Sequence, residues 1–430
     1  MKRLIASLVF LAAALASGGQ TAVKSLDSCV EYALSHNCDI LLGKSAEARS
    51  REDLRQSKLD LLPSLNLYVN QYYNWGRSVD MQELVIVRNR LTRQTSGSVG
   101  ASLPLFDGLQ RINTIAMNRH RAAAASQNVM QKTLDVKTDI AGAYLAEILA
   151  RLTAARLEQS LGNADAQLEI VRHKYNGGAA KRSDCLEMEA HKADIQGRLA
   201  AALSEQNTQM EQLCALMGCE ETFCTDTCIE AAIIPPPEKV WEELDVPVPS
   251  VTAAESSVAA AKSALRVAKG ALLPSLTLSA AYGTYYSDAS PDPFKEQLDG
   301  NRNPSVSLSL AVPVFDGGRA MLQVEKCRSE VKESSIRLEQ ARQQAELYRI
   351  RLKEEAATLY AQLAASISKR DFCRERLREL TAAHRSGSAT TSEWIDASEA
   401  SAQAECECVQ CQCKYIFQLK MIEYYRDGCR

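Results

Sequence analysis

A short stretch that occurs twice constrains the fold of this chain more than any other feature. It ends as Pro104-Leu105-Phe106-Asp107-Gly108 in the first copy and as Pro313-Val314-Phe315-Asp316-Gly317 in the second. The two copies are 209 residues apart. Apolar residues alternate with small or polar ones before each proline, and a long helical run begins after each glycine. Self-similarity over half of a chain indicates a duplicated architecture.

The alternating segments predict four β-strands, because residues two apart lie on one face of a strand. They cover residues of about 64–73, 96–105, 275–286 and 304–313. Each has roughly the ten residues with which a tilted strand crosses an outer membrane. One face is apolar and the other carries Ser, Thr, Asn and Gly, which suits a water-filled lumen. Residues 76–94 are charged and irregular, and we expect a loop there.

Long helices follow each pair of strands. Asp107 and Asp316 suit N-cap positions, because a carboxylate can accept the free amides of a helix start. Residues 109–174 contain no proline and only two glycines, so they predict a helix of roughly 100 Å at about 1.5 Å per residue. Such a length indicates a coiled coil or a similar assembly. Glycines near 178 and 387 interrupt the runs, which predicts helical hairpins over 108–217 and 316–427.

The N-terminus indicates export. Lys2 and Arg3 precede an apolar run over 4–16 and then small residues, which is the layout of a secretory signal peptide. A helical segment over 26–62 follows, with an expected break near Asn37. The formal net charge of −3 gives no indication of nucleic-acid binding. The expected organisation is a signal peptide over 1–22, a first structural repeat over 23–218, an equatorial connector over 219–249 and a second structural repeat over 250–430.

Four strands cannot close a membrane β-barrel, because open edges cannot face lipid and membrane barrels start at eight strands. Several chains must therefore contribute. Two chains would give a lumen plugged by the helical hairpins, whereas three chains give twelve strands and fit a channel better. A soluble sandwich is the alternative, but four strands in so long a chain would bury little. Tyr72, Tyr73 and Trp75 fit either a membrane-interface girdle or an ordinary strand end.

These motifs resemble those of the TolC family of outer membrane efflux proteins. Leu62-Pro63-Ser64-Leu65 and Leu273-Pro274-Ser275-Leu276 match the family's helix-to-strand junction. The segments from Pro104 and Pro313 match its strand-to-helix junction, and the run from Leu26 to Leu34 is similar to its first helix. The resemblance implies a mainly α-helical protein with a membrane β-barrel. Two repeats of strand hairpin plus long helical hairpin would form a trimeric twelve-stranded β-barrel on an α-helical barrel.

The resemblance also implies a passive export duct from periplasm to exterior, in a tripartite efflux or secretion system such as type I secretion. The implied partners are a homotrimer, a periplasmic membrane-fusion adaptor, an inner membrane pump of RND or ABC type, and outer membrane lipid, with no nucleic acid. Most of the chain would lie in the periplasm. The alternative is a secreted or periplasmic coiled-coil structural protein without a pore, but such a protein has no use for alternating strands.

The resemblance places the periplasmic tip, where the adaptor docks, at the helical turns of Gly178 and Gly387. The implied gate residues are Asp184, Glu393 and Asp396. A ring of such carboxylates attracts cations and repels anions. The alternative interpretation is that these acids lie in first helical turns because the helix dipole favours them there.

Some members of the family brace the closed tip with an arginine two residues after the second tip glycine. This chain has Ala389 at that position, so that latch is in doubt. Lys181 and Arg182, in the first turn after Gly178, could substitute for it. Trp394 is expected to pack between helices rather than to contact an adaptor.

The chain has 14 cysteines, which invites a metal or redox interpretation. Four fall in one predicted helix: Cys406, Cys408, Cys411 and Cys413. They lie on opposite faces at about 100° per residue, so they cannot enclose one zinc ion, and packing is the expected role. Better disulfide candidates in an oxidising compartment lie in the connector: Cys219, Cys224 and Cys228. The sequence has no zinc-protease motif, phosphate loop or nucleophile elbow, so we expect no enzyme, no cofactor and no metal.

Overall fold

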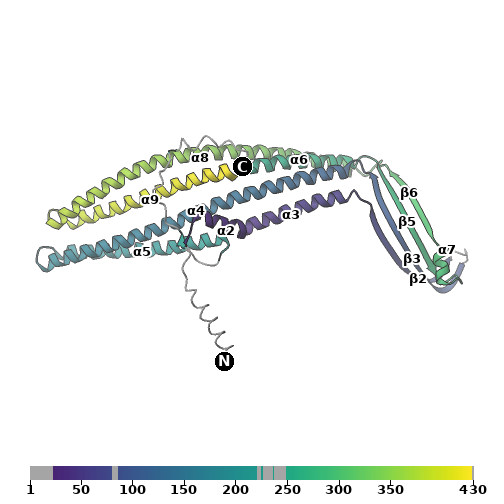
Figure 1. Cartoon of the computed structure of the whole chain (residues 1–430), viewed down its shortest axis with the longest axis horizontal. Coiled ribbons are helices and arrows are strands. Elements are labelled where there is room, and N and C mark those ends of the chain that lie inside the picture. Colours follow the sequence, from purple (N-terminus) through teal and green to yellow (C-terminus); the bar gives the residue numbers. More distant parts are fainter. Residues whose placement is uncertain (1–22, 80–85, 220–223, 226–235, 237–247, 429–430) are drawn as a thin grey trace, which may run out of the picture. The chain divides into compact units, whose positions relative to one another are not determined.

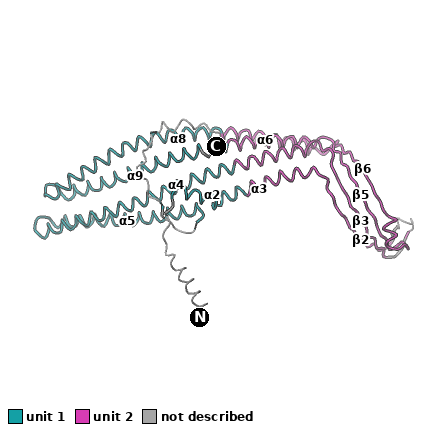
Figure 2. Tube along the Cα trace, viewed as in Figure 1, with its two compact units in different colours: residues 1–44, 128–250, 342–430 teal, residues 45–127, 251–341 magenta. Residues whose placement is uncertain are grey.

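The computed structural model describes residues 23–79, 86–219, 224–225, 236 and 248–428. The predicted signal peptide and most of the predicted connector lie outside the described residues. The chain divides into two compact units (Figure 2). One unit contains residues 1–44, 128–250 and 342–430, and the other contains residues 45–127 and 251–341.

Helices make up most of the described chain (Figure 1). Their bounds are α2 (Leu26–His36), α3 (Cys38–Leu59), α4 (Gln110–Asn176), α5 (Arg182–Met217), α6 (Pro249–Gly270), α7 (Phe294–Gly300), α8 (Arg319–Ser386) and α9 (Thr391–Gly428). The predicted break near Asn37 is confirmed: its side-chain oxygen accepts the Asp39 and Ile40 amides at 2.9 and 3.3 Å. None of the helices in the described part of the chain combines the length and the apolar character needed to cross a membrane.

Four antiparallel strands form one sheet in the order β2-β3-β5-β6, with bounds β2 (Ser64–Val79), β3 (Ile86–Phe106), β5 (Ser275–Ser287) and β6 (Asn303–Ala311). Two further strands of two residues each, β1 (Val23–Lys24) and β4 (Cys224–Thr225), pair in parallel. The expected loop over 76–94 is wrong for residues 76–79 and 86–94, because β2 continues to Val79 and β3 begins at Ile86; residues 80–85 lie outside the described residues. Polar cross-strand pairs such as Asn74 with Thr92 extend this hairpin without apolar alternation.

The register gives the sheet two chemically different faces, because residues directly opposite on neighbouring strands share a face. One cross-strand row joins Leu65, Ala101, Ala280 and Val306. The face that contains this row is called the apolar face, and its other members include Leu67, Val69, Val99, Leu276, Leu278, Leu308 and Leu310. The opposite, polar face includes Ser64, Asn66, Ser98, Ser102, Thr277, Ser279, Ser305, Ser307 and Ser309.

The strand-to-helix junctions use the predicted aspartates, although α4 and α8 begin three residues after them. The Asp107 carboxylate accepts the Arg111 amide at 3.2 Å, and the Asp316 carboxylate accepts the Ala320 amide at 2.7 Å. Pro313 follows β6. Pro104 lies inside β3, at a register shift after which pairing continues to Phe106.

The helix-to-strand junctions place Pro63 between α3 and β2, and Pro274 between α6 and β5. The end of α6 approaches the start of α4 closely. A Cβ placed on Gly108 would lie only 2.2 Å from the carbonyl oxygen of Gly270. Glycine is therefore required at position 108 both for its backbone φ of 66° and for this close approach.

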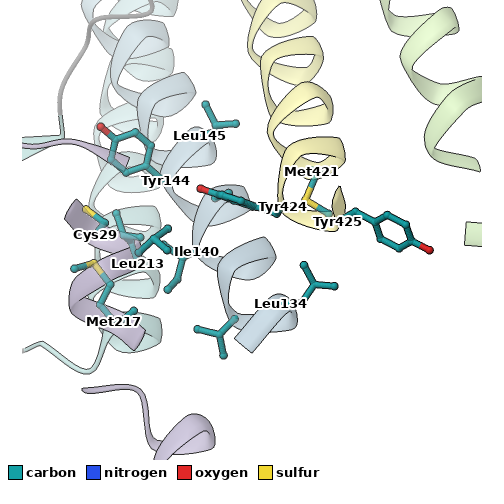
Figure 3. Close-up of a cluster of buried hydrophobic side chains, with 14 of the residues drawn as sticks. Cys29, Leu134, Ile140, Tyr144, Leu145, Leu213, Met217, Met421, Tyr424 and Tyr425 are labelled. Atoms are coloured by element: carbon teal, nitrogen blue, oxygen red, sulfur yellow. The ribbon is translucent and has the colours of Figure 1, made fainter. Parts of the chain in front are cut away.

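The larger hydrophobic core joins residues of α2, α4, α5, α8 and α9 (Figure 3). Cys29 of α2, Ile140 of α4, and Leu213 and Met217 of α5 are almost completely buried. Cys29 is therefore a core residue. The apolar face of α2 is buried against the longer helices, which ties the start of the described chain to them.

Candidate functional site

The two hairpin turns at the predicted tip have the same backbone geometry. Gly178 and Gly387 have φ angles of 78° and 81°, which favour glycine because it has no Cβ. The Ala179 amide donates to the Lys174 carbonyl oxygen at 2.8 Å. The Ser388 amide, at the equivalent position of the second repeat, donates to the Ala383 carbonyl oxygen at 2.9 Å. The duplication therefore extends to the hydrogen bonds that end α4 and α8.

The acids six residues after each tip glycine cap the next helix. The Asp184 carboxylate accepts the Lys181 amide at 3.0 Å. The Glu393 carboxylate accepts the amide and the hydroxyl of Thr390 at 2.8 and 2.9 Å, and Thr390 in turn accepts the Glu393 amide. This reciprocal pair is a capping box. These hydrogen bonds lower the pKa of Glu393 below its usual 4.5, the Thr390 amide contributing most, so its carboxylate stays ionised.

A further exposed acid lies one turn along each capped helix. Asp396 follows Glu393 by three residues, and Glu187 follows Asp184 by three, so each pair shares a helix face. Asp396 and Glu187 are both exposed and are 209 residues apart. Glu187 is missing from our sequence-based set of site residues, although the repeat offset itself indicates it. The two repeats thus carry matching pairs of acids.

At the tip, Lys174 joins the two hairpins, and it is not among the site residues predicted from the sequence. Its Nζ donates to the His384 carbonyl oxygen, at the end of α8, at 2.8 Å. Lys181 and Arg182 have exposed side chains, and Ala389 is half-buried. The sequence does not indicate this role of Lys174, because its partner is a backbone carbonyl from the other repeat.

Trp394 packs between helices, as the sequence predicts. It is 4% exposed and belongs to a small core with Leu168 and Val171 of α4 and Met188 of α5. Its indole Nε1 donates to the Thr381 hydroxyl of α8 at 3.1 Å. One aromatic side chain therefore links all four tip helices.

His384 lies in the same contact between the hairpins. Its side chain is buried, its ring stacks near that of Trp394, and its Nε2 lies 3.5 Å from the Thr391 hydroxyl oxygen. Burial lowers the pKa of His384 below its usual 6.5, and Lys174 lowers it further, while Asp184 opposes the shift. The imidazole is therefore held neutral beside a fixed cation.

Most of the cysteines that the structure describes pack as side chains of the helices and their cores. Within the described residues, no group of three or more His, Cys, Asp or Glu side chains is placed to hold a metal ion. Cys408 and Cys413 of α9 are buried, and burial raises the pKa of the Cys413 thiol to about 11. Such a thiol is protonated and behaves as a small apolar side chain. Cys228 lies outside the described residues, so the connector disulfide stays a prediction.

A sheet with one apolar and one polar face, joined to two long helical hairpins, is the architecture expected from the sequence for an outer membrane efflux protein. The chain belongs to the outer membrane efflux protein family, which it matches over residues 29–219 and 244–416. The resemblance found in the sequence is therefore confirmed, as is the fold class. The coiled-coil structural protein without a pore is not supported by this assignment.

Individual relatives agree with the family assignment. The chain is 22% identical to the outer membrane efflux protein BepC of Brucella suis over 367 residues, which cover 85% of this chain and 75% of BepC. A membrane protein from Pseudomonas aeruginosa has a TM-score of 0.80 at 18% identity, covering 93% of this chain and 90% of its own. The Campylobacter jejuni CmeC outer membrane channel also has a TM-score of 0.80, at 13% identity, with coverage of 94% and 85%.

The family assignment establishes the location and the general class of activity. The protein belongs to the outer membrane, and it is an efflux protein rather than an enzyme. The polar sheet face and the tip acids are therefore the candidate functional surfaces of this protein.

Proposed function

We propose that this protein is the outer membrane duct of a tripartite efflux or secretion system. The observation that carries the proposal is the sheet with two unlike faces. Leu308 on one face is 62% exposed in the single chain, whereas its neighbour Ser307 lies on the face of serines and threonines. Lipid on the apolar side and water on the polar side satisfy both surfaces.

The edges of the sheet support a homotrimer. Within the described residues, β2 and β6 each pair on one side only. Unpaired strand edges cannot face lipid, so the edge of one copy pairs with the edge of the next. Three copies give a twelve-stranded barrel wide enough for a passage. The sheet order supports this closure because β2 and β6 lie at opposite edges.

The duct is passive and depends on partners. The sequence has no phosphate-binding loop, so a separate inner membrane pump of the RND or ABC type supplies the energy. A periplasmic membrane-fusion adaptor docks at the helical tip around Gly178, Gly387 and Ala389, where Lys181 and Arg182 are exposed. The Lys174 contact between the hairpins is the kind of interaction that adaptor binding would release.

The gate consists of the tip acids. Asp184, Glu393 and Asp396 lie at or near helix starts, and Glu187 completes the matching pair in the first repeat. Capping does not neutralise Glu393, because its carboxylate stays ionised within the capping box. In a trimer these carboxylates repeat around one axis, where a charged ring favours cations over anions.

The test is direct. The mature protein is extracted from outer membranes in detergent, its mass is measured by light scattering, and its conductance is recorded in planar bilayers. The proposal expects a trimer with cation-preferring channel conductance. A monomer that forms no pore would overturn it.

A further inference from the structure

The short helix α7 lies against β5 near the end farthest from α6 (Figure 1). Two contacts define the face of the sheet that it covers. The Thr284 hydroxyl donates to the Leu298 carbonyl oxygen at 2.8 Å, and the Tyr286 ring meets the Phe294 ring edge-on with centroids 5.1 Å apart. Thr284 and Tyr286 lie an even number of residues from Leu278, so they share its face. α7 therefore lies on the apolar face.

Hydrogen bonds hold this segment in one place. Gln297 of α7 is 1% exposed. Its Oε1 accepts the Ser287 amide at 2.9 Å, and its Nε2 donates to the Asp292 carbonyl oxygen at 2.7 Å. Asn301 donates to the Tyr285 carbonyl oxygen at 2.8 Å. Burying an amide side chain is unfavourable unless it is hydrogen-bonded, so these bonds make α7 a fixed part of the sheet's outer end.

The position of α7 along the strands coincides with the end of the apolar band. The band runs on β5 from Leu276 to Thr284, which is about 27 Å of strand at about 3.4 Å per residue. At a tilt of about 40° this corresponds to roughly 20 Å of height, close to the band of about 25 Å of an outer membrane barrel. Tyr286 is the next residue on this face, and Phe294 covers it. α7 thus begins where the acyl region would end.

Other aromatic residues lie on the same face near this height. Gln71 of β2 shares a cross-strand row with Tyr286 through β3. Tyr73 and Trp75 follow it on the same face of β2, with their rings stacked. Trp75 is 74% exposed and Phe294 is 56% exposed. Aromatic side chains concentrate where a membrane surface meets water.

We propose that α7 is an interfacial element that rests on the outer leaflet, with Phe294 at the boundary between lipid headgroups and acyl chains. This inference rests on the proposed function, because it requires the apolar face to contact lipid. The charged residues Lys295, Glu296 and Asp299 are exposed around the rest of the helix. A helix with an apolar edge and a charged remainder is suited to a membrane surface. The surface that α7 adds is continuous with the apolar face of β5.

Tryptophan fluorescence tests this placement. The variant Phe294→Trp is made in a Trp75→Phe background, and the trimer is reconstituted in dioleoylphosphatidylcholine vesicles, with or without bromine atoms on the acyl chains near the headgroup. Bromine quenches tryptophan only on contact with the lipid. Glu296→Trp in the same background is the matched control, because Glu296 lies on the exposed side of the same helix. The Trp75→Phe protein keeps Trp241 and Trp394, so its emission is subtracted from that of each variant. We expect brominated lipid to remove most of the emission that the tryptophan at position 294 adds and little of that which the tryptophan at position 296 adds.

A second comparison separates this inference from the proposed function. The difference in emission between the unsubstituted protein and Trp75→Phe reports the contact of Trp75 with lipid. Quenching at Trp75 without quenching at position 294 would overturn the placement of α7 alone. A blue emission maximum at position 294 would then mean that a neighbouring copy covers it, and a red one that it faces water. Absence of quenching at both positions would overturn the membrane placement of the sheet itself.

Discussion

The carboxylate of Glu393 has two roles: it caps the start of α9 and, in our proposal, it contributes charge to the channel entrance. Glutamine can accept the same Thr390 amide without carrying charge. We therefore expect Glu393→Gln with Asp396→Asn to reduce the preference for cations while the tip remains as stable as before. Reversal potentials in planar bilayers under a salt gradient measure the selectivity, and thermal unfolding measures the stability.

The alanine variant separates the two roles. Glu393→Ala removes both the charge and the capping bond, so it should lower the stability of the tip as well as the selectivity. If Glu393→Gln with Asp396→Asn left the reversal potential unchanged, the helix-start role would be sufficient to explain these acids. The same measurement on Glu187→Gln tests whether the first repeat contributes to the ring.

Because His384 is buried at the tip, we expect the stability of the tip to fall in acid. The groups that face it from other helices are Lys174 of α4, Asp184 of α5, and Thr391 and Trp394 of α9. Because burial lowers the pKa of His384 below 6.5, the unfolded state binds the proton more readily than the folded state. Its contribution to stability is therefore complete above pH 6.5 and is lost as the pH falls from there to the lowered pKa.

Hydrogen exchange of the tip amides, corrected for the intrinsic effect of pH, measures this loss. We expect faster exchange around residues 168–188 and 381–397 as the pH falls below the ordinary histidine value. His384→Gln is the control, because its side chain is neutral at every pH. An equal acid response in this variant would assign the effect to the carboxylates instead.

The two strand-to-helix junctions differ in how closely a neighbouring helix approaches their glycines. Gly108 and Gly317 occupy equivalent positions and have φ angles of 66° and 71°. A Cβ at Gly317 meets nothing within 4 Å, whereas a Cβ at Gly108 would clash with Gly270. Gly317→Ala should cost about 1–2 kcal/mol for the left-handed backbone. Gly108→Ala should cost roughly 1–3 kcal/mol more, because α6 must also move.

Thermal unfolding of the detergent-solubilised protein compares the two variants. The difference between their unfolding temperatures isolates the contact between the start of α4 and the end of α6, because the backbone strain is common to both. Equal unfolding temperatures would mean that α6 shifts without cost and that Gly108 is needed only for its φ angle.

Local signals account for the elements that the sequence predicts. The helix formers, the paired glycines and the alternation before each proline act over a few residues, so they indicate the four strands and the long helices. The outer half of the first hairpin lacks apolar alternation, which is why Ile86 to Gln94 was expected to be a loop. Helix α7 has only seven residues, too few for a helical pattern to show. Its position depends on the side chain of Gln297, which accepts the Ser287 amide of the preceding strand.

The candidate site likewise has a part that the sequence indicates and a part that it does not. Capping by Asp184 and Glu393 involves residues three apart, so the sequence alone can indicate it. The bond from Lys174 to His384 joins residues 210 apart through a backbone carbonyl that no motif encodes. Glu187 was predictable in principle, because it repeats Asp396 at the offset that revealed the duplication.

At the scale of the whole molecule, the two faces of the sheet decide whether the chain can enter a membrane as a trimer. Leu308 and Ser307 are adjacent on β6 and lie on opposite faces. Leu308→Lys should cost about 2–4 kcal/mol per chain if position 308 lies near the middle of the bilayer, and the yield of trimer in outer membrane fractions should fall. Ser307→Lys places the same charge in the lumen, where water solvates it.

Ser307→Lys should therefore assemble normally and change only conduction, with a weaker preference for cations in planar bilayers. Trimer yield on gel filtration and reversal potential, measured for both variants, distinguish assembly from conduction. If the two lysines reduced the yield equally, both faces would be buried by protein and the barrel arrangement would be wrong. If only Ser307→Lys prevented assembly, the lipid and lumen faces would be reversed. The expected asymmetry follows from the period of two along one strand, and each copy of the chain contributes it to the assembled wall.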